Sequence, residues 1–104
     1  MRTKIFTFNK AQKLPDEMEK KINEGLLTGQ FKYANQVEMP DTARIVLTVF
    51  MGDEASTVKC KVFRETEYGL IEKKLNAFLE TGIKMKFCTQ SCTGGTVIAI
   101  LFYE

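Results

Sequence analysis

The residues that could do chemistry in this chain are three cysteines, three tyrosines and a mixture of lysines and acidic residues, with no histidine among 104 residues. The lack of histidine removes Ser-His and Cys-His nucleophile pairs and the commonest protein ligand for zinc. The tyrosines have no base or nucleophile at a spacing typical of a catalytic site. We therefore expect a protein that is not an enzyme and that binds no metal or cofactor.

Cys88 and Cys92 are the cysteines closest together in the sequence. On an extended strand their side chains share one face but lie about 13 Å apart, which is beyond disulfide reach. A closed zinc site would need Cys60 and a carboxylate as well. We interpret the thiols as structural or inert. Free thiols, together with a first segment that lacks the apolar stretch of a signal peptide, predict a cytoplasmic location without membrane contact.

A second candidate group consists of lysines that alternate along two expected strands, with aromatic residues in the same strands. Such a surface tracks a phosphate backbone and stacks bases in some proteins, whereas in others exposed lysines keep strand edges from aggregating. The chain has a net charge of only +2 and no arginine-rich patch, so nucleic-acid binding is possible but not favoured. The candidate binding residues are Lys59, Lys61, Lys84, Lys86, Phe87 and Gln90.

Two short motifs have a simpler structural interpretation. The segment Thr93-Gly94-Gly95-Thr96 resembles part of a phosphate-binding loop, but the lysine and helix that should follow are missing, so we expect a hairpin turn. The triplets Glu19-Lys20-Lys21 and Glu72-Lys73-Lys74 occupy positions between apolar residues of helical spacing. We expect both triplets to form charged helix faces exposed to solvent.

The two triplets belong to an internal repeat. Residues 18–29 and 71–82 align at an offset of 53, and seven of the twelve columns are identical. The match extends at an offset of 54, with Gln36 on Gln90 and Leu47 on Leu101, and upstream at an offset of 55, with Lys4 on Lys59. We therefore predict a single domain over 1–104 that contains two repeats, 2–52 and 55–104.

Each repeat has the pattern strand, helix, strand, strand. Met18, Ile22 and Leu26 recur at helical spacing in the first repeat, as do Ile71, Leu75, Phe78 and Leu79 in the second. Gly29 and Gly82 follow the expected helices as left-handed C-terminal residues. The strands that come next alternate, with Phe31 and Tyr33 opposite Lys32 in the first repeat, and with Met85 and Phe87 opposite Lys84 and Lys86 in the second.

The last strand of each repeat is nearly continuously apolar, from 44 to 50 and from 96 to 103. Such a run indicates that both faces of the strand are covered. We therefore place the third strand of each repeat between the first and second, antiparallel to both, in the split β-α-β arrangement. The predicted fold is α+β: two tandem β-α-β-β repeats in a two-layer sandwich, with two helices packed on antiparallel or mixed sheet.

One helix can cover only one face of each central strand, so a second cover is needed. The sequence leaves three covers open: the other repeat, a second copy of the chain, or a ligand or foreign partner.

The repeat unit also resembles a family of very small sporulation-associated bacterial proteins of unknown function. The resemblance rests on Glu-Lys-Lys-(Ile/Leu)-Asn, on Lys32-Tyr33 or Lys86-Phe87, and on the apolar final strand that ends Leu101-Phe102-Tyr103-Glu104. It is better for residues 70–104 than for 14–51. The family implies no activity, cofactor or site, so the resemblance suggests only a covalently fused dimer of its unit.

The sequence favours a non-catalytic cytoplasmic interaction protein that associates with itself through its sheets as a homo-oligomer. Two alternatives stay open. The first is a small inhibitor or ligand-sequestering protein, of the kind that mobile elements encode against host defence, and the second is a nucleic-acid-binding protein. An enzyme that uses only lysine, glutamate and tyrosine is the least favoured.

Overall fold

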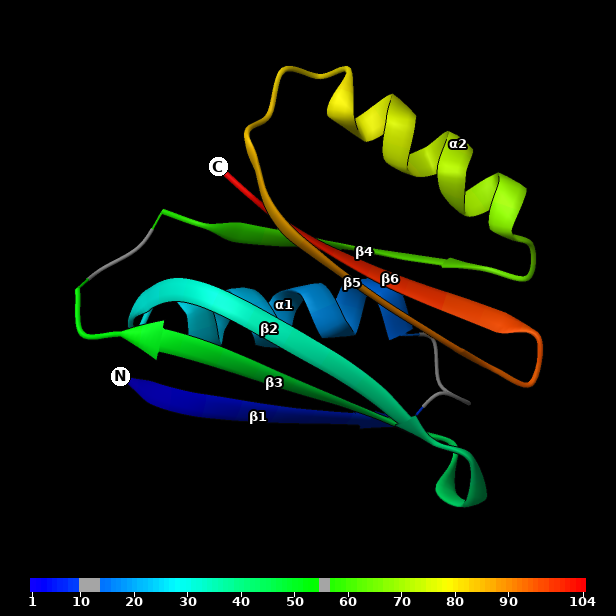
Figure 1. Cartoon of the computed structure of the whole chain (residues 1–104), viewed down its shortest axis with the longest axis horizontal. Coiled ribbons are helices and arrows are strands. Elements are labelled where there is room, and N and C mark those ends of the chain that lie inside the picture. Colours follow the sequence, from blue (N-terminus) through cyan, green and yellow to red (C-terminus); the bar gives the residue numbers. More distant parts are fainter. Residues whose placement is uncertain (10–13, 55–56) are drawn as a thin grey trace.

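The computed structural model describes residues 1–9, 14–54 and 57–104, and shows two βαββ units in succession (Figure 1). The elements of the first unit are β1 (Arg2–Asn9), α1 (Leu14–Leu26), β2 (Gln30–Met39), a short 3-10 helix η1 (Pro40–Thr42) and β3 (Arg44–Gly52). Those of the second unit are β4 (Lys59–Glu65), α2 (Tyr68–Leu79), β5 (Met85–Thr93) and β6 (Thr96–Tyr103). In the part of the chain that is described, no helix is long and apolar enough to cross a membrane.

Each unit forms its own three-stranded antiparallel sheet with its last strand in the centre. Sheet A has the order β1-β3-β2 and sheet B the order β4-β6-β5. The α+β class, the two β-α-β-β units and the central position of the third strand are therefore confirmed. The strand order follows from the helix crossover, which keeps the first two strands of a unit parallel and leaves room between them for the third.

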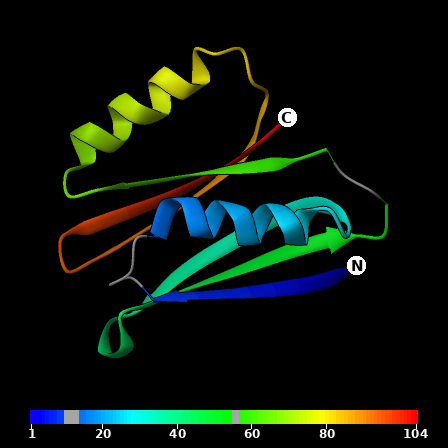
Figure 2. The ribbon, with the colours of Figure 1, turned by 180° about the vertical axis from the view of Figure 1, so that it is seen from behind.

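The two sheets lie over one another as two layers, and the helices occupy different places. Seen from behind, α1 lies between sheet A and β4 (Figure 2), and its side chains bond to the backbone of β4. α1 thus covers one part of sheet A while sheet B covers the rest. α2 packs on the opposite face of sheet B.

The apolar residues divide into two clusters according to these layers. The larger cluster is formed by the stripe of α1, the α1-facing side of sheet A and the inner side of sheet B. It includes Met18, Ile22, Leu47, Val49, Cys60, Ile98, Ile100 and Phe102. The smaller cluster, between sheet B and α2, is formed by Phe63, Ile71, Val97, Ala99 and Leu101 with Leu75, Phe78 and Ile83 at its rim.

A β-bulge interrupts the second strand of each unit, at Lys32 in β2 and at Lys86 in β5. The rows before the bulges are Arg2, Met51 and Phe31 in sheet A and Lys59, Tyr103 and Met85 in sheet B. Matching these rows aligns Phe6 with Phe63 and Phe50 with Phe102. The alignment from sequence, at offsets of 55 and 54 for the first and last strands, is thus two residues out of register there.

Each helix of the repeat ends with the same threonine contact. The hydroxyl of Thr28 donates to the carbonyl of Gly25 at 2.7 Å, and that of Thr81 donates to the carbonyl of Phe78 at 2.6 Å. Gly82 has the predicted positive φ of 87°. The prediction of a left-handed Gly29 was wrong: this glycine is required by close packing, because a Cβ there would lie 2.6 Å from the carbonyl oxygen of Gly52.

The Thr93-Gly94-Gly95-Thr96 segment is a two-residue hairpin, as predicted. Thr93 pairs with Thr96, and Gly94 and Gly95 have φ values of 59° and 77°. Two consecutive positive φ values are those of the type I′ turn that joins β5 to β6.

Candidate functional site

The four predicted lysines lie on opposite edges of sheet B. Lys59 and Lys61 belong to β4, whereas Lys84 precedes β5 and Lys86 forms its bulge, with β6 between the two pairs. Lys61 lies 3.6 Å from a carboxylate oxygen of Glu19, and Lys86 lies 3.9 Å from one of Glu104. The structure therefore does not gather the four ammonium groups into one stripe.

Phe87 and Gln90 are separated by the pleat of β5. Phe87 points into the larger core cluster, where its ring lies 6.2 Å from that of Phe31, and Phe63 is buried beneath α2. Neither ring is positioned to stack on a base. Gln90 lies on the opposite face of β5, exposed, beside Cys88 and Cys92. The bulge removes Lys86 from this row, a feature that strict alternation of side chains could not predict.

All three cysteine thiols are free. Among the residues described, no three Cys, Asp or Glu side chains come together as metal ligands would. Burial raises the pKa of the Cys60 thiol to about 12, helped by the nearby Glu19 carboxylate, and burial also raises the pKa of Cys88. At neutral pH both thiols are protonated, which suits them to packing rather than to nucleophilic attack.

One set of polar contacts between the two units comes from α1. The backbone N–H of Cys60 donates to Asn23 Oδ1 at 2.7 Å, and that of Val62 donates to Glu19 Oε1 at 2.8 Å. β4 is an edge strand, so these N–H groups have no strand beside them, and the side chains of α1 supply the missing acceptors.

Gln36 supplies the second set of polar contacts, where β2 crosses β5. Its amide donates to Ser91 Oγ at 2.6 Å and to the carbonyl of Ile98 at 3.1 Å, and its carbonyl oxygen accepts from the Thr89 hydroxyl at 2.7 Å. We call the contacts of Glu19, Asn23 and Gln36 with the second unit the joint.

The joint corrects one sequence-based interpretation. Lys20 and Lys21 are exposed, as predicted for the triplet, but Glu19 is half-buried and bonds to β4. The position of Glu19 between the apolar residues of the helix does not predict its bond to β4. The feature of the sequence that singles out these positions is that Glu19 and Asn23 are identical to Glu72 and Asn76 in the other repeat.

The two central strands, β3 and β6, differ in how many of their faces are covered. β6 is buried on both faces, as the apolar run predicts, because the first unit covers one face and α2 the other. β3 is fully buried only toward α1, and on its other face Val46, Thr48 and Phe50 are half-buried. The expectation of two covered faces thus holds for β6, but among the residues that the structure describes it does not hold for β3.

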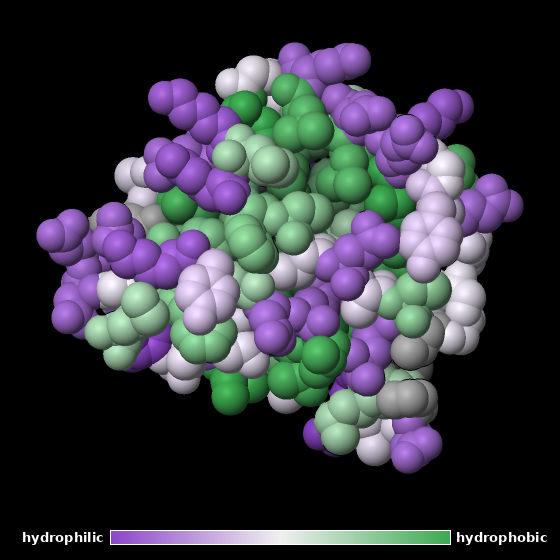
Figure 3. All heavy atoms as spheres, in the orientation of Figure 1, coloured by the Kyte–Doolittle hydropathy of each residue, from purple (hydrophilic) through white to green (hydrophobic). Residues whose placement is uncertain are grey.

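The uncovered face of sheet A carries several apolar side chains. Ile5 is 60% exposed, Val37 51% and Tyr33 46%, and the Tyr33 ring stacks on Phe50 with centroids 4.4 Å apart. We call this surface the open face: Ile5, Tyr33, Asn35, Val37, Val46, Thr48 and Phe50. In Figure 3, apolar atoms lie open along the lower part of the molecule, where sheet A lies, and again below α2. Exposed apolar patches are common at interaction sites, so the open face is the candidate site of this chain.

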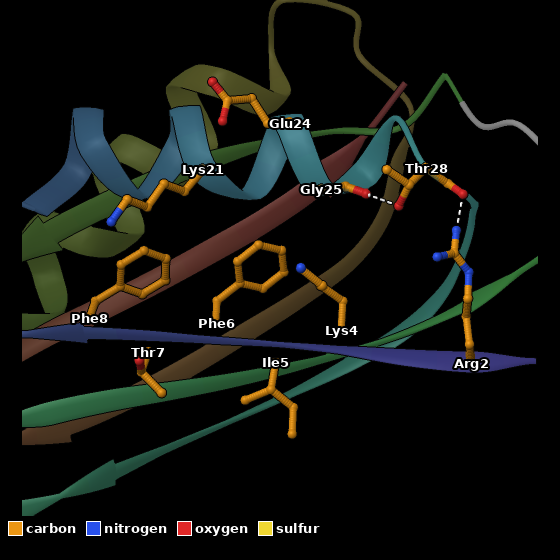
Figure 4. A pocket seen from close by; sticks show the side chains of 10 residues that line it. All are labelled: Arg2, Lys4, Ile5, Phe6, Thr7, Phe8, Lys21, Glu24, Gly25 and Thr28. Carbon is orange, nitrogen blue, oxygen red and sulfur yellow. Dashed lines mark hydrogen bonds between the residues drawn. The ribbon is translucent and has the colours of Figure 1, made fainter.

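A hollow of about 560 Å³ lies along the free edge of β1, beside α1. Figure 4 shows Phe6 and Phe8 pointing from β1 toward α1, whereas Ile5 and Thr7 point to the other side of the strand. The Arg2 guanidinium closes one end by donating to the carbonyl of Thr28. The hollow is wide open and polar, with Lys4, Lys21 and Glu24 on its walls.

Comparison with protein-family models, with curated proteins and with solved structures found no match. The resemblance to the sporulation-associated family therefore stays a prediction.

Proposed function

We propose that this chain is a non-catalytic cytoplasmic interaction protein that associates with copies of itself, and that the open face of sheet A is the surface it uses. One observation carries the proposal. On the corresponding face of sheet B, the central residues Ile98, Ile100 and Phe102 are completely buried against the first unit, whereas that face of sheet A is uncovered within the described chain.

The chemistry of the open face supports association with protein. Aromatic and aliphatic side chains without charge form its centre, which is typical of the core of a protein–protein interface. The equivalent residues of sheet B already make such a contact inside the chain. The three cysteines are free thiols, which agrees with a reducing compartment.

The sequestering and nucleic-acid-binding alternatives stay predictions. The positions of the lysines and of Phe87 favour neither over self-association.

Sedimentation velocity from about 1 µM to about 1 mM protein tests the proposal, because the upper concentration detects association even with a millimolar Kd. We expect the weight-average mass of the wild type to rise with concentration. Val37→Lys places a charge in the open face and should hold the chain as a monomer. Leu27→Lys is the matched control, because Leu27 is 76% exposed outside the open face, and this variant should associate like the wild type. A wild type that stays monomeric up to about 1 mM overturns the proposal.

A further inference from the structure

Both halves of the joint recur in the chain, the acceptors on α2 and the donors on β1, and within the described residues neither recurring half has a partner. Resting on the proposed self-association, we propose that the open face and β1 edge of one copy dock on the α2 side of the next copy and repeat the joint between chains. The α2 side is formed by Glu72, Asn76, Leu79, Met85 and Gln90. Association of this kind is head-to-tail.

The acceptors of the joint recur on α2. Glu72 and Asn76 align with Glu19 and Asn23 at the helix offset of 53. Each helix packs on the equivalent face of its own sheet. The side chains of Glu72 and Asn76 are exposed, and within the described residues neither has a hydrogen-bond or ion-pair partner. In the first repeat the same two residue types hold an edge strand.

The donors of the joint recur on β1. Matching the bulges aligns Thr3 and Ile5 with Cys60 and Val62, which donate to α1. β1 and β4 hold the same place and direction in their sheets, so residues facing away from the helix direct their N–H groups to the free edge. Thr3 and Ile5 face away from α1, so their N–H groups point outward. Lys4 matches Lys61, the ion-pair partner of Glu19, and would pair with Glu72 of the next copy.

The apolar residues beside the joint recur as well, and they are exposed where no second unit packs on them. Leu26, beside the joint, is 1% exposed, whereas its equivalent Leu79 is 39% exposed. Phe31 is 8% exposed and stacks on Phe102 at 4.4 Å, whereas its equivalent Met85 is 54% exposed. The open face offers Phe50, the equivalent of Phe102, to cover Met85.

The polar centre of the joint recurs with one difference. Gln90 is the equivalent of Gln36 and is exposed, with no side-chain hydrogen bond among the described residues. Facing it in the next copy would be Asn35 in place of Thr89 and the carbonyl of Val46 in place of that of Ile98. Val37 stands in place of Ser91 and lacks its hydroxyl. The contact between chains therefore has one hydrogen bond fewer than the joint, in keeping with reversible association.

A joint repeated between chains is a heterologous interface, because different surfaces of the two copies meet. An isologous dimer formed by two open faces is the competing arrangement. The two differ in one respect that can be measured: only the head-to-tail arrangement requires the α2 side.

Complementation between two variants tests the proposal. Val37→Lys blocks the open face and leaves the α2 side intact, whereas Gln90→Lys blocks the exposed centre of the α2 side and leaves the open face intact. We expect each variant alone to be monomeric by sedimentation velocity, and an equimolar mixture to form a 1:1 heterodimer and nothing larger. Circular dichroism melting of each variant verifies that it is folded.

Two outcomes overturn the inference. If the wild type associates and Gln90→Lys associates equally well, the interface is isologous or lies elsewhere, and the proposed function survives. If two folded monomeric variants do not combine, the surfaces are not complementary. A monomeric wild type, by contrast, removes the proposed function itself.

A second pair of variants, with smaller expected effects, measures how much an acceptor side chain of α2 contributes to the dissociation constant. Asn76→Ala removes the acceptor for Thr3 and should raise the dissociation constant about tenfold. Lys73→Ala, on the exposed side of the same helix, is the control and should leave the dissociation constant unchanged. Equal constants for the two variants would show that α2 does not hold the β1 edge.

Discussion

The two βαββ units share the strand order, the bulge and the threonine contact at the helix end, yet their sheets are covered very differently. The second unit has the first unit on one face and its own helix on the other, so β6 is buried on both sides. Among the described residues nothing lies over the open face of the first unit, and Ile5, Tyr33 and Val37 on it are exposed. The same residue type at equivalent positions is thus buried where a neighbouring unit packs on it, as at Phe102, and half-buried where none does, as at Phe50.

Units of repeat proteins behave in this way wherever one of their faces has no neighbour. In such proteins each unit completes its neighbour, and an end unit without a polar cap leaves an apolar face. Among the described residues, nothing caps the open face of the first unit and nothing covers the α2 side of the second. In the proposed head-to-tail association these two surfaces are complementary, because each matches one half of the joint.

Replacing the aromatic residue of each central strand gives the largest expected difference between the units. Phe102 is fully buried and stacks on Phe31, so Phe102→Ala should lower the free energy of unfolding by about 3–5 kcal/mol. Phe50, its equivalent, is half-buried, and Phe50→Ala should cost about 1 kcal/mol in dilute protein. Urea denaturation at micromolar concentration measures both. Equal losses would contradict the difference in cover.

Removing the equivalent asparagines should give the next largest difference. Asn23→Ala leaves the buried N–H of Cys60 without an acceptor, at a cost of about 1–3 kcal/mol in unfolding free energy. Asn76→Ala removes an exposed side chain and should change that free energy by less than about 0.5 kcal/mol in the monomer. The same denaturation series gives the comparison, and a loss of stability in Asn76→Ala as large as in Asn23→Ala would show that Asn76 has a partner within the monomer.

The smallest expected effect is on the pH dependence of the unfolding free energy, which the buried Cys60 thiol should steepen. Burial raises the pKa of its thiol from 9.0 to about 12 in the folded state, so above pH 9 the unfolded chain releases a proton that the folded chain keeps. Unfolding is therefore favoured as pH rises through this window, by up to about 1.4 kcal/mol per pH unit. Denaturation between pH 8 and about 10 should show this slope in the wild type and a reduced slope in Cys60→Ala. A slope unchanged by Cys60→Ala would contradict the burial of this thiol.

Much of the architecture could be predicted from the sequence because it depends on local periodicity. The stripe of Met18, Ile22 and Leu26 and the continuous run from 96 to 103 determine a helix and a doubly covered strand. The hairpin at Gly94-Gly95 follows from the φ values that only glycine adopts easily. These features belong to single elements, so one sequence is enough to find them.

The contacts between elements could not be predicted in the same way. The bulges at Lys32 and Lys86 shift side chains between faces, and no residue type in the sequence requires them. The role of Glu19 depends on the approach of β4, which comes 40 residues later in the chain. The sequence predicts only that the second face of β3 is covered by something. Which residues of sheet A stay exposed depends on how the two units dock, and a single sequence does not show this.

Amide hydrogen exchange at two protein concentrations tests the central claim most directly. The N–H groups of Cys60 and Val62 should exchange slowly at every concentration, because Asn23 and Glu19 hold them within the chain. Those of Thr3 and Ile5 should exchange rapidly in dilute protein and slow down as the concentration rises, when α2 of another copy covers the β1 edge. Exchange at Thr3 and Ile5 that does not change with concentration, in protein that associates, would contradict the account.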